Sequence, residues 1–151
     1  MTMDLILWRH ADAAEGYPDH ERQLTEKGRA QAKSVAEWLN KHLQDDTVLL
    51  VSPAVRAQQT AKALKRRFTT CDAIQPGADY AAVLKAIGQP EAVGTTLVVG
   101  HQPTLGQVAS FLLTGAEGEL SVKKGAVWWI TLRRGRKDLA VLRAVMTPEM
   151  L

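Results

Sequence analysis

The chain has 151 residues, of which 46% are hydrophobic and 23% charged, the length and balance of one globular domain rather than of a disordered chain. No apolar run approaches the roughly 18 residues that cross a bilayer, no signal-peptide pattern opens the sequence, and the single cysteine, Cys71, excludes an internal disulfide. We therefore expect a single domain over residues 1–151, in the cytoplasm and without membrane contact. The net charge of +3 suits an anionic substrate, whereas basic groups without interleaved aromatic residues do not indicate nucleic-acid binding.

The first half of the chain predicts two buried strands, each followed by a helix. In order, the elements are a strand over 5–9, a polar loop over 10–24, a helix over 26–43, a strand over 48–51 and a helix over 53–68. Thr25 can cap the first helix, and Pro53 suits the first turn of the second.

The second half continues the alternation and ends in two strands. In order, we expect a short strand over 71–75, a helix over 79–87 ending at Gly88, a strand over 96–99, a helix over 103–113 closed by Gly115, and strands over 126–132 and 139–145. A hairpin around Gly135 would join the last two strands.

This order of elements predicts an α/β fold: a three-layer α/β/α sandwich with a mostly parallel central sheet and an antiparallel edge. In such sheets the ligand site lies beyond the carboxyl ends of the strands. Three predicted strands lead there into polar residues, which are Arg9-His10, Ser52-Pro53 with Arg56 one turn later, and Gly100-His101. We expect these residues to meet at one end of the sheet.

Arg9 is the least expected of these residues, because a permanently charged guanidinium beside a buried strand needs an anionic partner. Asp12 could be that partner, and Arg9 would then be structural. The functional alternative is a bound phosphate, which arginine holds through two parallel hydrogen bonds. Alone, His10 and His101 also have ordinary structural explanations.

Two more arginines extend the pattern. Arg22 precedes the first helix, and Arg56 lies in the first turns of the second, where the helix N-terminus favours anions. Each alone would be an ordinary surface arginine. Two histidines and three arginines at strand ends and helix starts are hard to explain as structure, and they indicate a site for a phosphoryl group.

Four segments, in this order, resemble the signature elements of the histidine phosphatase superfamily, in its branch with an Arg-His-Gly or Arg-His-Ala signature. They are Leu-Trp-Arg-His-Ala-Asp-Ala-Ala at 7–14, Arg-Gln-Leu-Thr-Glu-Lys-Gly-Arg-Ala-Gln-Ala at 22–32, Val-Ser-Pro-Ala-Val-Arg-Ala-Gln-Gln-Thr-Ala at 51–61 and Val-Gly-His-Gln-Pro at 99–103. With Pro-Gly-Ala-Asp at 76–79 and the small size, the chain looks most like the SixA-type protein-phosphohistidine phosphatases. The resemblance implies a phosphoglycerate-mutase-like fold.

The resemblance also implies roles. His10 would be the nucleophile and carry a covalent phosphoryl group, while Arg9, Arg56 and His101 bind that group and Arg22 adds a further contact. Neutral His10 must keep one ring nitrogen free, and we expect a backbone carbonyl to fix the other. We predict that His101 is cationic when phosphate is bound. No metal or cofactor is implied.

The proton donor is less well defined. Cleavage of a phosphate ester needs an acid near the leaving oxygen. Asp79 matches best in position and Asp12 is the second candidate, with Glu15 and Glu21 as rivals. A phosphohistidine substrate reduces the need for an acid, because imidazole is a better leaving group than an alkoxide.

The short segments 11–24 and 57–100 leave no room for the helical cap of larger relatives, so we expect an open groove suited to phosphohistidine on a partner signalling or phosphotransfer protein. One alternative is a phosphatase for small phosphomonoesters, and another is a non-catalytic module that binds phosphate. A third is a metal hydrolase with His10, Asp12 and His20 as ligands, although no paired histidine motif supports it.

Overall fold

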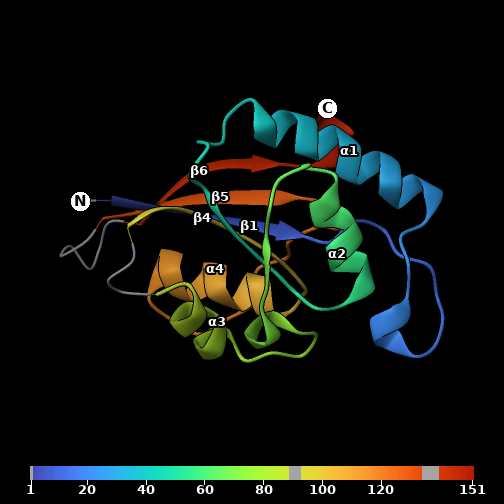
Figure 1. Ribbon diagram of the computed structural model, residues 1–151. Helices are drawn as coiled ribbons and strands as arrows, with labels where there is room; N and C mark the ends of the chain where they lie inside the picture. Colours follow the sequence, from blue (N-terminus) through green and yellow to red (C-terminus); the bar gives the residue numbers. More distant parts are fainter. Residues whose placement is uncertain (1, 89–92, 134–139) are drawn as a thin grey trace.

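The computed structural model describes residues 2–88, 93–133 and 140–151 (Figure 1). The strands are β1 (Thr2–Arg9), β2 (Val48–Val51), β3 (Thr69–Thr70), β4 (Gly94–Gly100), β5 (Val127–Arg133) and β6 (Ala140–Met146). The α-helices are α1 (Glu26–Asn40), α2 (Val55–Lys62), α3 (Tyr80–Ala86) and α4 (Thr104–Thr114). Short 3-10 helices lie at Asp19–Glu21, Asp72–Ile74 and Pro148–Met150.

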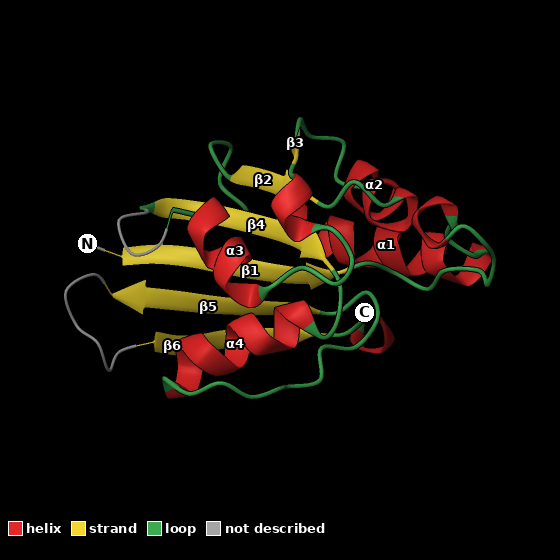
Figure 2. Cartoon of the chain, turned by 90° about the horizontal axis from the view of Figure 1, so that it is seen from below, coloured by secondary structure: helices red, strands yellow, loops and turns green. Residues whose placement is uncertain are grey.

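The strands of the described residues form one sheet in the order β3-β2-β4-β1-β5-β6. The first four strands in this order are parallel, whereas β5 runs antiparallel to β1, and β6 antiparallel to β5. Helices α1 and α2 cover one face, and α3 and α4 cover the other (Figures 1 and 2). The predicted three-layer sandwich with a mostly parallel sheet and an antiparallel edge is confirmed.

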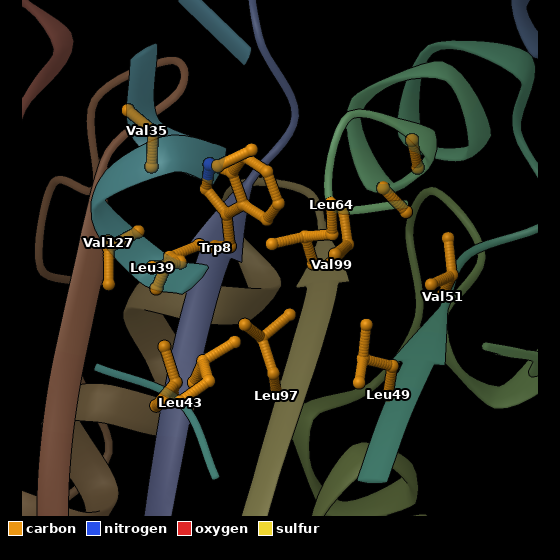
Figure 3. Packing of buried hydrophobic residues seen from close by; sticks show 14 of the residues in the cluster. Trp8, Val35, Leu39, Leu43, Leu49, Val51, Leu64, Leu97, Val99 and Val127 are labelled. Carbon is orange, nitrogen blue, oxygen red and sulfur yellow. The ribbon is translucent and has the colours of Figure 1, made fainter. Parts of the chain in front are cut away.

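The central strands have continuous apolar sequences because the sheet is buried on both faces. Successive side chains of β1 point to opposite faces: Ile6 and Trp8 pack with α1 and α2, and Leu5 and Leu7 with α3 and α4. The Trp8 indole lies among the buried side chains that pack between the sheet and helices α1 and α2 (Figure 3). Its Nε1 donates a hydrogen bond of 3.1 Å to the carbonyl of Gly125, which satisfies the one polar atom of this fully buried ring.

Two predicted elements differ from the structure. The second helix begins at Val55 and ends at Lys62 instead of running from 53 to 68, because the chain turns there to bury Leu64 against the core, with its carbonyl bonded to Asn40. The strand predicted at 71–75 is wrong: the two-residue β3 ends at Thr70, and Asp72–Ile74 form a 3-10 helix that buries Ile74. In both places tertiary packing overrides the local pattern.

The ends of the other predicted elements agree closely. Thr25 caps α1 through the backbone N–H of Gly28, and Gly115 ends α4 with a φ of 76°. The expected hairpin at Gly135 lies outside the described residues. Within the ranges that the structure describes, no helix has the length and apolar character needed to cross a membrane.

Candidate active site

The register of the parallel strands brings the two histidines together. Arg9 of β1 pairs with Gly100 of β4, so His10 and His101 follow at the same end of the sheet. Their ring centroids are 5.2 Å apart. On the other side of β4, Ser52 leaves β2 and bonds through its N–H to the carbonyl of Val99. The predicted meeting of the strand ends is therefore confirmed.

His10 is 6% exposed and has one ring nitrogen fixed. Its Nδ1 lies 2.7 Å from the carbonyl oxygen of Ala11, so Nδ1 carries the proton and Nε2 keeps its lone pair. This is the expected hydrogen bond to a backbone carbonyl. Burial lowers the pKa of His10 to about 4, the Ala11 hydrogen bond opposes this shift, and the charges of Arg56, Arg9 and Arg22 add to it. The imidazole is therefore neutral at pH 7, as a nucleophile must be.

His101 is fixed by a different partner. Its Nε2 lies 2.7 Å from Ser52 Oγ, and that oxygen already accepts a bond from the N–H of Ala54. Ser52 is fully buried, and among the described residues His101 Nε2 is the acceptor within reach of its hydroxyl proton. The hydroxyl therefore donates to Nε2, which leaves the ring proton on Nδ1. Burial, then His10 and Arg56, lower the pKa of His101 to about 3. Its cationic form in a phosphate complex stays a prediction.

Arg9 does not pair with Asp12, the partner that would have made it structural. Its NH1 donates to the carbonyl of Val122 at 3.0 Å, while Asp12 accepts from Thr25 and Lys124. Burial and the charge of Arg56 lower the pKa of Arg9. No carboxylate is described beside this guanidinium, so Arg9 lacks an anionic counterpart of its own.

Arg56 is 4% exposed and bonds with one end of its guanidinium. NH1 donates to the carbonyl oxygen of Asp19 at 2.8 Å and NH2 to its carboxylate at 3.0 Å. Arg22 lies beside it: its Nε donates to the same carboxylate at 3.0 Å and its NH1 to the Ala14 carbonyl at 3.1 Å. Asp19 thus joins two of the predicted phosphate ligands.

Unsatisfied donors gather at this place. In the described parts of the chain, four buried side-chain atoms lack a hydrogen-bond partner, and three of them are Arg9 Nε, Arg56 Nε and His101 Nδ1. Each such donor costs about 1–3 kcal/mol if it stays unpaired. Three donors around the His10 ring are the complement of a group that carries several anionic oxygens.

The loop after His10 is held by side chains of two of the signature segments. Thr60 Oγ1 accepts from the N–H of Ala11 at 3.1 Å, and Gln31 Oε1 accepts from the N–H of Asp12 at 2.9 Å. Gly28 lets α1 approach closely, because a Cβ there would lie 2.0 Å from the Asp12 carbonyl oxygen. These contacts hold the backbone that follows His10.

Sequence reasoning missed two polar residues that contact the predicted site residues. Ser52 is predicted at a strand end beside the histidines, but its hydrogen bond to His101 is not predicted. Asp19 was treated as part of a polar loop, although it lies three residues before Arg22, a spacing at which side chains meet in a helical turn.

The two candidate proton donors differ. Both carboxylate oxygens of Asp12 are engaged, and the hydrogen bond from Thr25, then that from Lys124, lower its pKa. An ionised Asp12 does not suit the role of an acid at neutral pH. Asp79 caps α3 by accepting from the N–H of Ala81, and the preceding Ala78 carbonyl accepts from Thr104 at the start of α4. The acid role of Asp79 stays a prediction.

His20, the third residue of the conceivable metal site, lies in the exposed 3-10 helix with its Nε2 4.0 Å from Glu21. Over residues 2–88, 93–133 and 140–151, no group of three or more His, Cys, Asp or Glu side chains is arranged to hold a metal ion.

The chain is similar in sequence to known proteins. The family model described as "Histidine phosphatase superfamily (branch 1)" matches residues 5–79. The chain is 32% identical to the phosphohistidine phosphatase SixA homolog of Haemophilus influenzae, over 73% of this chain and 77% of that protein. It is 30% identical to phosphohistidine phosphatase SixA of Escherichia coli, over 75% of this chain and 76% of SixA.

Solved structures extend the similarity to nearly the whole chain. The protein histidine phosphatase SixA complexed with tungstate superimposes with a TM-score of 0.82 and 26% identity, over 98% of this chain and 99% of that one. A phosphoserine phosphatase from Entamoeba histolytica, in complex with 3-phosphoglyceric acid, has a TM-score of 0.70 at 16% identity. This second likeness concerns the fold alone.

Proposed function

Since the chain belongs to the histidine phosphatase superfamily and is a SixA-like phosphatase, we propose that it hydrolyses phosphohistidine on a partner signalling or phosphotransfer protein, through a covalent phosphoryl group on His10. One observation carries this proposal. The three unpartnered donors Arg9 Nε, Arg56 Nε and His101 Nδ1 surround a neutral histidine whose Nε2 keeps its lone pair.

The reaction has two steps. First, Nε2 of His10 attacks phosphorus, the bond from phosphorus to the substrate imidazole breaks, and the leaving nitrogen keeps the electron pair and takes a proton from solvent water. The Ala11 carbonyl, bonded to Nδ1–H, favours the positive charge that grows on the His10 ring. Then water attacks phosphorus and gives one proton to the solvent while the bond from phosphorus to Nε2 breaks, which releases inorganic phosphate and restores neutral His10.

Arg9, Arg56 and His101 stabilise the transferring group in both steps. Its negative charge is spread over three equatorial oxygens, and fixed cations and N–H donors lower the barrier most where that charge develops. Arg22, held beside Arg56 by Asp19, adds positive charge on the loop side. These steps use only side chains of this chain and water.

Two features favour phosphohistidine over a phosphate ester. Asp12 is ionised and doubly hydrogen-bonded, so it cannot protonate an alkoxide, whereas a leaving imidazole needs less help. In its described part, the segment between Arg56 and His101 contains only core elements of the sandwich, which are the rest of α2, β3, a 3-10 helix, α3 and β4. A site without an inserted cap suits a phosphoryl group presented on a protein surface.

The test uses a phosphotransfer protein labelled with ³²P on histidine, compared with a phosphoaspartyl receiver protein and with sugar phosphates. We expect the highest kcat/KM on the phosphohistidine protein and, after rapid quenching without acid, label on His10. His10→Ala should abolish turnover, while the matched control His20→Ala, at an exposed site, should keep it. Label on another residue, or normal turnover by His10→Ala, would refute the mechanism; preference for sugar phosphates would refute the substrate.

A further inference from the structure

Asp19 accepts hydrogen bonds from both Arg22 and Arg56 with its side chain, and from Arg56 also with its main chain. One carboxylate oxygen accepts from Arg22 Nε and the other from Arg56 NH2, each at 3.0 Å. The carbonyl oxygen of the same residue accepts from Arg56 NH1 at 2.8 Å. In the described structure, these are the two arginine–carboxylate ion pairs at the site.

The edges of the guanidinium decide what this contact does. Arg56 uses its terminal edge, NH1 and NH2, for Asp19, and its Nε is buried and unpartnered. The N–H at Nε therefore remains without a protein acceptor and can donate to a phosphoryl oxygen. If Asp19 mimicked the bound phosphate, it would be expected to take the Nε edge. The carboxylate supports Arg56 from behind instead of occupying its place.

The environment of the pair distinguishes it from an ordinary surface ion pair. The Asp19 carboxylate is 59% exposed, but the Arg56 side chain is only 5% exposed, so this cation is fixed at the edge of the core. Desolvation alone would raise the pKa of Asp19, but the hydrogen bonds and charges of Arg56 and Arg22 outweigh it and lower the pKa. Asp19 stays ionised at neutral pH and available to both arginines.

We propose that Asp19 is a positioning residue of the phosphoryl site, which holds Arg56 and Arg22 so that the Nε edge of Arg56 faces the bound group. Asp19 itself touches neither substrate nor His10. The proposal rests on the proposed function only in taking the bound group to be a phosphoryl group.

The test compares Asp19→Asn with the matched control Asp72→Asn, which makes the same change at the first residue of another 3-10 helix, where no arginine contact is described. Asparagine has one acceptor oxygen and no charge, so it cannot serve both arginines. We expect Asp19→Asn to lower kcat/KM about 10- to 100-fold, the range typical of a misplaced binding group. Asp19→Glu, which keeps the charge, should recover part of this loss, and Asp72→Asn should match the unmodified protein.

A second measurement does not depend on turnover: calorimetric titration of each protein with inorganic phosphate. Weaker phosphate binding by Asp19→Asn, with an unchanged melting temperature, supports the positioning role. Unchanged binding and kcat/KM, or tighter phosphate binding, would overturn it, because Asp19 would then be inert or would compete with the anion. If phosphate binding falls as expected but no protein hydrolyses phosphohistidine, the proposed substrate is wrong and the role of Asp19 stands.

Discussion

At the scale of single residues, hydrogen bonds decide which ring nitrogen of each histidine is free to act. Both rings are buried and neutral, yet their tautomers have different causes: a main-chain carbonyl for His10 and the Ser52 hydroxyl for His101. Because Ser52 is fully buried and His101 Nε2 is the acceptor described beside its hydroxyl, the hydroxyl proton is donated to that nitrogen. The two rings therefore take opposite roles, His10 with a free lone pair and His101 with a free N–H.

Ser52→Ala tests this assignment. Removing the hydroxyl leaves His101 Nε2 without its donor, so the ring no longer favours the tautomer that carries the proton on Nδ1. We expect kcat/KM to fall about 10- to 100-fold, as when other partners that orient a functional histidine are removed. Ser110→Ala is the control, because Ser110 is a buried serine that bonds to the Ala116 carbonyl in the loop after α4. Equal kcat/KM for Ser52→Ala and the unmodified protein would contradict the assignment.

At the scale of elements, the start of α1 is packed directly on the segment that follows His10. Thr25 caps the helix through the N–H of Gly28 and donates its hydroxyl proton to Asp12. Gly28 leaves no room for a side chain, since its Cβ would approach the Asp12 carbonyl. Helix propensity therefore favours alanine at position 28, whereas the packing of α1 on the Asp12 segment requires glycine.

Gly28→Ala separates these two demands. In an open helix the change would stabilise the protein by about 1 kcal/mol. Here the clash with backbone should instead destabilise it by about 1–3 kcal/mol and lower activity, because α1 or the Asp12 segment must move. Thermal unfolding and kcat/KM measure both effects, with the exposed Lys33→Ala in the same helix as the control. A raised melting temperature would mean that the close approach does not exist.

At the scale of the whole molecule, the site makes stability depend on pH. Unfolded histidines bind protons near pH 6.5, whereas folded His10 and His101 do so only near pH 4 and pH 3. Between these values the unfolded state holds more protons. The contribution of the two neutral histidines to the free energy of unfolding is therefore complete above pH 6.5. It is lost as the pH falls toward 4 and below.

Denaturant unfolding between pH 7 and pH 5 checks this dependence. We expect the free energy of unfolding to fall, with a slope of up to about 1.4 kcal/mol per pH unit for each histidine. His101→Gln should reduce the slope of the free energy of unfolding against pH. The control is His42→Gln, at an exposed site in the turn that follows α1, which should not reduce it. A free energy of unfolding that stays constant over this range would show that the buried rings accept protons freely.

The sequence by itself determined the sandwich and the main members of the site. Short apolar strands alternating with amphipathic helices leave few arrangements, and parallel strands must end at a common edge. Arg9, His10, Arg56 and His101 stand at strand ends or one turn beyond, so the topology alone brings them together. Arg22 could be found because it lies next to a helix start in a signature segment.

Only the tertiary structure decided what fixes these groups. The Val122 carbonyl is 113 residues from Arg9, and Ser52 is 49 residues from His101, separations at which no local pattern pairs residues. The end of α2 at Lys62 and the 3-10 helix after β3 likewise follow from burying Leu64 and Ile74. Local sequence patterns record which face of an element is apolar. Hydrogen-bond partners such as Asp19 depend on how distant segments meet, and that is set when the core packs.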